Sequence, residues 1–234
     1  MNVAVAGLLI FSGCQSGGGG AKSADKGDNG SNHDGWQRDF DLAKKTFSIT
    51  GTNDYFVLKS GYQVQLAGGD DQVTITVMME HQTIGGVKTR VVEERVKQRN
   101  ALVRIVRHFY AYCQETGDIF NFGQDVDVLH VATPITHEGT WRAEGKKNKP
   151  GLLVPGKPKV GAKFYMSQAP DVDMDRAEIT KLDLDVSIYR NCLQEVVTTP
   201  LDEQKRVLQI YAPGIGLVAR GHLGLTKYGF VNAN

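Results

Sequence analysis

The chain has almost no excess of either charge and little proline. Its 234 residues include 27 Lys and Arg against 26 Asp and Glu, which argues against a general polyanion binder. Proline accounts for only 7 residues and charged side chains for 23%, so the composition gives no sign of global disorder. The 41% of hydrophobic residues are ample for one substantial core.

The motifs of common catalytic sites are also missing from the sequence. We find no GxSxG elbow, no HExxH, no paired CxxC and no dinucleotide fingerprint. The run GGGGAKS at residues 17–23 lacks the spacing and the strand–loop–helix setting of a phosphate loop. We therefore expect a protein that is not an enzyme and holds no cofactor.

An apolar run that ends in a cysteine opens the chain. Residues 3–12, VAVAGLLIFS, would rise about 15 Å as a helix, roughly half of a bilayer core, which is too short to span it. The length suits the apolar region of a signal peptide, residues 1–13. The piece IFSGC resembles the lipobox of bacterial lipoproteins, and this resemblance implies that Cys14 is lipidated and anchors the chain to a membrane. The alternative is an ordinary cleaved signal peptide in which the cysteine is incidental.

Residues 14–35 follow as a segment rich in glycine and serine, with almost no apolar side chains to bury. Such a composition is typical of a flexible tether, which would let a folded domain stand off the membrane. Gln15, rather than Asp, follows the cysteine, and by resemblance to lipoprotein sorting rules this favours the outer membrane, if the cell has one. An exported address also argues against nucleic acid as a partner.

The remainder, residues 36–234, reads as a single antiparallel all-β domain. In QVTITVMMEH, residues 72–81, apolar side chains alternate along the segment, which is typical of a half-buried strand. Residues 88–113 are rich in β-branched and aromatic residues with a break at KQRNA, which favours two strands over one helix. Apart from a short helix within residues 36–47, we expect roughly ten strands in a meander curled into a barrel, a half-barrel or a sandwich.

Several segments occur in an order that resembles a known family. They are TRVVEERV, FGQDVDVL, GTWRAEG followed by the PG and P-x-VG pieces, NCLQ, and APGIGLV. The chain resembles, over most of residues 55–220, a family of uncharacterised β-rich secreted bacterial proteins and lipoproteins. It departs from that pattern at Asn121, where the family carries an aromatic residue. The resemblance implies a secreted or anchored β domain and no particular activity.

Two cysteines remain besides Cys14. Cys113 and Cys192 could form a disulfide in an oxidising compartment, closing a loop of 192 − 113 = 79 residues. Such a closure would stabilise the fold by roughly 4–5 kcal/mol. The alternative is two separately buried thiols that need no partner.

The run DVDMD places Asp171, Asp173 and Asp175 at alternate positions. Oxygen ligands with this spacing suit Ca²⁺, so these three residues are the candidate metal site. An EF-hand loop that starts at Asp171 would need glycine and glutamate where the chain has Arg176 and Leu182. An acidic surface loop is the alternative.

The sequence leaves two classes of function open. The first is a lipid-anchored envelope protein whose curved sheet binds an apolar or amphipathic ligand, such as a lipid. The second is a structural or interaction lipoprotein with a packed core and a surface for a protein partner. Trp141, Tyr110 and Tyr112 suit either class, because aromatic side chains both pack sheets and line pockets.

Overall fold

The computed structural model describes residues 35–130 and 132–231. The predicted signal peptide, lipidated Cys14 and nearly all of the predicted tether lie outside the described residues. Within these ranges the only helical element is the 3₁₀ turn η1 (Leu42–Lys44). No helix among the described residues is long and apolar enough to cross a membrane.

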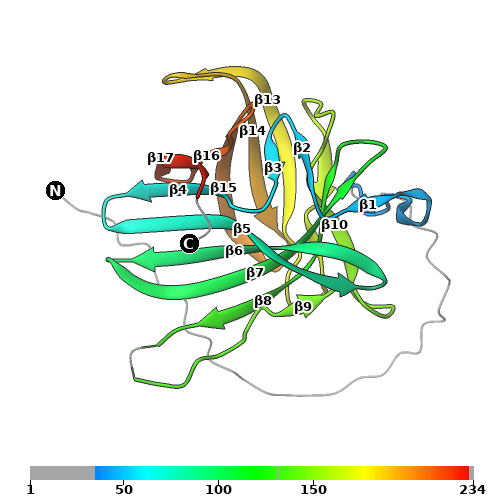
Figure 1. Cartoon of the computed structure of the whole chain (residues 1–234), viewed down its shortest axis with the longest axis horizontal. Helices are drawn as coiled ribbons and strands as arrows, with labels where there is room; N and C mark the ends of the chain where they lie inside the picture. Colours follow the sequence, from blue (N-terminus) through cyan, green and yellow to red (C-terminus); the bar gives the residue numbers. More distant parts are fainter. Residues whose placement is uncertain (1–34, 131, 232–234) are drawn as a thin grey trace. The chain divides into compact units, whose positions relative to one another are not determined.

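The described chain is built of antiparallel strands, which confirms the predicted all-β class (Figure 1). The strands are β1 (Phe47–Ser48), β2 (Gly51–Asn53), β3 (Phe56–Leu58), β4 (Tyr62–Gly68), β5 (Asp71–Ile84), β6 (Val87–Gln98), β7 (Ala101–Cys113), β8 (Ile119–Val128), β9 (Trp141–Arg142), β10 (Lys149–Val154), β11 (Lys163–Tyr165), β12 (Ser167–Gln168), β13 (Arg176–Val186), β14 (Tyr189–Thr199), β15 (Asp202–Ala212), β16 (Gly216–Arg220) and β17 (Leu223–Phe230). Thirteen of them follow one another in the order β11-β13-β14-β15-β16-β17-β4-β5-β6-β7-β8-β10-β12. The strands outnumber the ten expected, because several are only two or three residues long.

The two ends of this strand order meet in one short segment of chain, residues 163–168. Its first half, β11, pairs with β13 through Tyr165↔Arg176, and its second half, β12, pairs with β10 through Ser167↔Pro150. The change of partner occurs at Met166, whose backbone nitrogen donates to the carbonyl of Asp175 at 2.7 Å. The sheet thereby returns on itself as a nearly closed barrel, one of the three shapes expected.

The segment that the sequence left between helix and strands forms the β6–β7 hairpin. Its turn consists of Arg99 and Asn100, both with positive φ, at 49° and 63°. A two-residue turn of this kind matches the right-handed twist of paired strands. The prediction of two strands joined at KQRNA is therefore confirmed.

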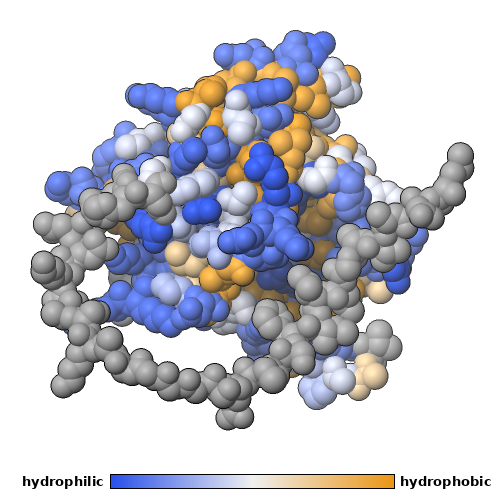
Figure 2. All heavy atoms as spheres, turned by 180° about the vertical axis from the view of Figure 1, so that it is seen from behind, coloured by the Kyte–Doolittle hydropathy of each residue, from blue (hydrophilic) through white to orange (hydrophobic). Residues whose placement is uncertain are grey.

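Apolar side chains gather in two clusters of different size. The larger one joins buried side chains from most of the strands, and Leu58, Leu66 and Phe120 in it are fully buried. The smaller one joins Cys192, Ile210, Ala212 and Val218, with side chains of the β13–β14 hairpin packed against it. Seen from behind, orange side chains gather near the top of the molecule, where this hairpin lies (Figure 2).

Candidate functional site

One end of the barrel is filled by the β2–β3 hairpin. The hydroxyl of Tyr55 at the hairpin turn donates to the carbonyl of Asn191 at 3.1 Å, near the start of β14. Phe56 packs its ring against Tyr110 of β7, with centroids 5.9 Å apart. Gly51 lies so close to the ring of Tyr112 that a Cβ would collide with it. The hairpin therefore closes this end of the barrel like a plug.

Beyond the plug, strands of the barrel surround a cavity of about 490 Å³. Alternate residues of each strand point inward, so β15 contributes Lys205, Val207, Gln209 and Tyr211. The cavity opens past the other end of β14, where Leu201 and Val172 are 49% and 43% exposed. Its volume lies in the range of about 300–1,000 Å³ that is typical of small-molecule sites.

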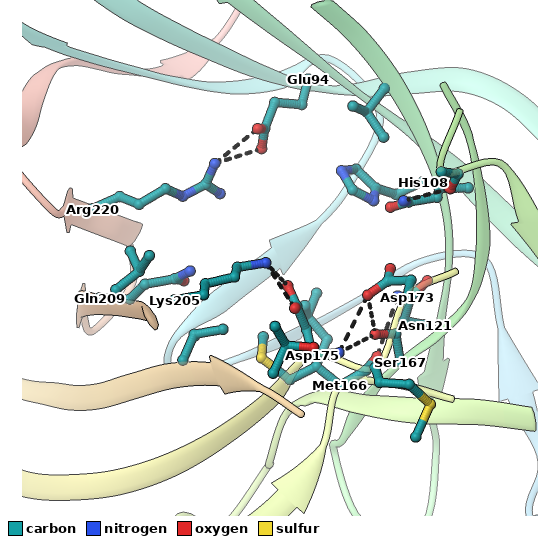
Figure 3. A pocket seen from close by; sticks show the side chains of 18 of the residues that line it. Glu94, His108, Asn121, Met166, Ser167, Asp173, Asp175, Lys205, Gln209 and Arg220 are labelled. Atoms are coloured by element: carbon teal, nitrogen blue, oxygen red, sulfur yellow. Dashed lines mark hydrogen bonds and ion pairs between the residues drawn. The ribbon is translucent and has the colours of Figure 1, made fainter. Parts of the chain in front are cut away.

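An ion pair spans the cavity between β6 and β16 (Figure 3). Nη1 of Arg220 donates to both carboxylate oxygens of Glu94, at 2.8 and 2.9 Å. Burial raises the pKa of Glu94, but the charge and the hydrogen bond of Arg220 outweigh this and hold the pKa below its usual value. The two side chains are still 13% and 26% exposed, because they face the cavity.

A second chain of polar groups runs from β14 to the cavity wall. The hydroxyl of Tyr211 lies 2.6 Å from Oε1 of Gln209 and 3.2 Å from Oε1 of Glu195. Burial raises the pKa of Glu195 to about 8, so this carboxyl is protonated at neutral pH. A protonated Glu195 can donate to Tyr211, which leaves the single hydroxyl hydrogen of Tyr211 for Gln209.

His108 projects into the cavity from β7, and its ring stacks on Tyr110 with centroids 5.2 Å apart. Burial lowers its pKa to about 4, although the charge of Glu94 acts in the opposite direction. The imidazole is therefore neutral at physiological pH. Its Nδ1 is buried and has no hydrogen-bond partner in the described part of the chain.

Charged groups also line the cavity near its mouth. Nζ of Lys205 donates to both oxygens of Asp175, at 2.7 and 2.8 Å. Asp173 accepts from Nε1 of Trp141 at 3.0 Å and from the hydroxyl of Ser167. Burial, followed by the neighbouring charge of Asp173, raises the pKa of Asp175.

The three aspartates of the predicted calcium site separate in the structure. Asp173 and Asp175 line the cavity, whereas Asp171 is exposed and lies 3.3 Å from Nζ of Lys147. Within residues 35–130 and 132–231, no group of three or more His, Cys, Asp or Glu side chains is arranged to hold a metal ion. Calcium binding by these residues stays a prediction.

The two cysteines of the predicted disulfide are free thiols in the structure, as in the alternative of two separately buried thiols. Cys113 belongs to the larger apolar cluster and Cys192 to the smaller one. The thiol of Cys113 lies 3.2 Å from Oε2 of Glu115, and that of Cys192 lies 3.8 Å from the carbonyl of Arg190.

Of the aromatic candidates, Tyr110 lines the cavity, Tyr112 packs on the plug and Trp141 binds Asp173. The interior groups Glu94, His108 and Glu195 were not predicted from the sequence. A usable signal exists: Glu195 lies between Leu193 and Val197, which share its face of the strand. A charged residue between two inward apolar ones marks such a position.

No known family model matches the chain, and no curated protein or solved structure matches it. The resemblance to a family of secreted β-rich proteins therefore stays a prediction.

Proposed function

We propose that the protein binds one small amphipathic molecule in the cavity of its barrel and performs no chemistry on it. The observation that carries this proposal is the cavity of about 490 Å³, which has both apolar and charged side chains in its wall. A protein that needed only a packed core would gain stability by filling this space with apolar side chains.

The wall suits a molecule with two kinds of surface. Phe56, Ile75, Val207 and Leu217 offer apolar contacts, while the ion pair of Glu94 with Arg220 offers polar ones. Such a mixture is typical of ligand sites, where apolar side chains supply affinity and a few polar groups fix orientation. The alternative, a fully packed interaction protein, would not need this hollow.

The proposal can be tested with two tryptophan substitutions on opposite faces of β15, only one of which fills the cavity. Val207→Trp places a large ring in the cavity, whereas Leu208→Trp places the same ring on the opposite face of β15, where Leu208 is 39% exposed. We would titrate each full-length variant, freed of co-purified lipid, with phenylnaphthylamine, whose fluorescence rises in apolar surroundings.

We expect one bound dye per chain in the wild type and in Leu208→Trp, and at least a tenfold weaker affinity in Val207→Trp. Circular dichroism and thermal melts establish that both variants fold. Equal binding by the two variants, or no saturable binding by the folded wild type, would rule the proposal out.

We place the protein in the cell envelope, anchored through Cys14, on the strength of the lipobox-like sequence. Cys14→Ser should remove the acyl chains from the mature protein and release it from membranes into the soluble fraction. Unchanged fractionation and unchanged acylation, read by mass spectrometry, would contradict the anchor without touching the cavity.

A further inference from the structure

We propose that the cavity binds the anionic head of its ligand, a carboxylate or a phosphate, between Arg220 and Gln209. This inference rests on the proposed function and names the class of ligand. It follows from which hydrogen-bonding groups of the cavity wall already have partners and which do not.

The carboxylates that line the cavity already have hydrogen-bond donors. Glu94 accepts hydrogen bonds from Arg220, and Asp175 accepts them from Lys205. Asp173 receives the indole of Trp141 and the hydroxyl of Ser167. A ligand rich in donors would have to compete with these contacts.

The two arginines of the cavity wall, in contrast, have N–H groups that can still donate hydrogen bonds. Arg220 uses only Nη1 for Glu94, its Nε is buried without an acceptor, and its Nη2 has none among the described residues. Arg104 also lines the cavity and makes no hydrogen bond or ion pair within the described ranges. An arginine offers five N–H donors, so a single carboxylate on one nitrogen leaves much of its capacity unused.

Gln209 is the cross-strand partner of Arg220 in the pairing of β15 with β16. Opposed residues on one face of a sheet hold their side chains within about 5 Å of each other at Cβ. Both side chains extend from the same wall into the cavity (Figure 3). The two residues therefore form one receptor rather than two separate contacts.

The hydroxyl of Tyr211 fixes the orientation of the Gln209 amide. Its carbonyl oxygen accepts the hydroxyl of Tyr211 at 2.6 Å, so its amide nitrogen, a donor, is the end left for the cavity. Tyr211 is held in turn by the buried carboxyl of Glu195. Glu195 and Tyr211 are thus positioning residues for a donor that faces the ligand.

Together these groups favour an oxyanion over a neutral or cationic head. Two donors from neighbouring strands, one of them charged, match the two oxygens of a carboxylate or phosphate. Hydrogen bonds with an ionised partner are also stronger than neutral ones, above all where protein surrounds them. The aromatic and aliphatic wall formed by Phe56, Ile75 and Leu217 is left for the apolar part of the same molecule.

The test uses two dyes that differ by one anionic group. Anilinonaphthalene sulfonate and phenylnaphthylamine share a ring system, and only the first carries a sulfonate. We expect the full-length wild type to bind the sulfonate at least tenfold more tightly. Decanoate and decyl phosphate should displace it, and the stronger of the two identifies the natural head group, whereas decanol should displace it at least tenfold less effectively.

Gln209→Glu is the informative variant, because it keeps the acceptor for Tyr211 and turns the donor into a negative charge. It should lose at least tenfold in affinity for the sulfonate and stay within threefold for the neutral dye. Gln204→Glu adds the same charge to an exposed position of the same strand and should change neither affinity. If Gln209→Glu fails to fold, the double variant Glu94→Gln with Arg220→Gln replaces it, with the same expected loss.

The outcomes separate this inference from the proposed function. Equal binding of both dyes by the wild type, equal displacement by decanol, or a sulfonate affinity unchanged in the variants would overturn the anionic head and leave the ligand cavity intact. No saturable binding of either dye would overturn both.

Discussion

At one end of the barrel the β2–β3 hairpin fills the interior, whereas toward the other end the same strands enclose a cavity of about 490 Å³. The plug is a separate sheet of two three-residue strands, whereas the wall of the cavity consists mainly of inward-facing residues of the long barrel strands. The two regions also differ in their side chains: the plugged end buries rings and aliphatic chains such as Tyr55 and Leu58, and the hollow end carries Glu94, His108 and Arg220.

The two ends therefore serve different purposes: the plugged end stabilises the fold, and the hollow end is left for binding. Dense packing around the plug contributes the apolar burial that holds the barrel together. The hollow end gives up such burial and places charged groups out of bulk water, which costs stability unless they are paired. Substitutions at the two ends should therefore have different consequences.

The largest effect should come from truncating the plug. Leu58→Ala removes a fully buried side chain from β3, and we expect a loss of about 3–5 kcal/mol in the free energy of unfolding. Val207→Ala, which shortens a side chain that already faces the cavity, should cost about 1 kcal/mol or less. Urea titrations of both variants measure the contrast, and equal losses would mean that the two ends are equally packed.

Next in size is the ion pair of the hollow end. Arg220→Met leaves the carboxylate of Glu94 without its partner, and we expect a loss of about 2–3 kcal/mol, moderated by access to the cavity. The double variant Glu94→Leu with Arg220→Met should recover most of that loss, because neither charge remains. Urea titration of the two variants tests this, and a double variant no more stable than the single one would show that the charges are not coupled.

The sequence predicted the long strands of the barrel far better than the cavity between them. The alternation of Val73 and Val77 and the break at KQRNA predicted strands that exist, because a half-buried sheet imposes period two on its residues. The closure of the barrel could not be foreseen, since it depends on one residue, Met166, at which the chain changes partners.

The polar interior was missed for a related reason. Glu93 and Glu94 are neighbours in the sequence, yet Glu93 pairs with Arg95 and Arg107 while Glu94 points into the cavity toward Arg220. Adjacent residues of a strand face opposite sides, and the pattern does not tell which side is enclosed until the sheet has curled. Partners from β6 and β16, more than a hundred residues apart, then meet only in the folded barrel.

A smaller effect should be a dependence of the unfolding free energy on pH, caused by Glu195. Its pKa is raised to about 8 in the fold from about 4.5, so its stabilising contribution is complete below pH 4.5 and is lost as the pH rises toward 8. The difference in unfolding free energy between the wild type and Glu195→Gln should fall by about 2 kcal/mol from pH 6 to pH 7.5. Urea titrations across this range measure it, and a constant difference would mean that Glu195 is ionised in the fold.

The smallest effect belongs to Asp171, the one aspartate of the acidic run that does not line the cavity. Asp171→Asn removes an exposed carboxylate whose partner, Lys147, is exposed too, and we expect a change within about 0.5 kcal/mol. Millimolar calcium should then leave the melting temperature of the wild type unchanged, since Asp173 and Asp175 already have donors of their own. A rise in melting temperature that Asp171→Asn abolishes would instead support the calcium site suggested by the spacing, and it would mean that these aspartates exchange protein donors for the ion at the cavity mouth.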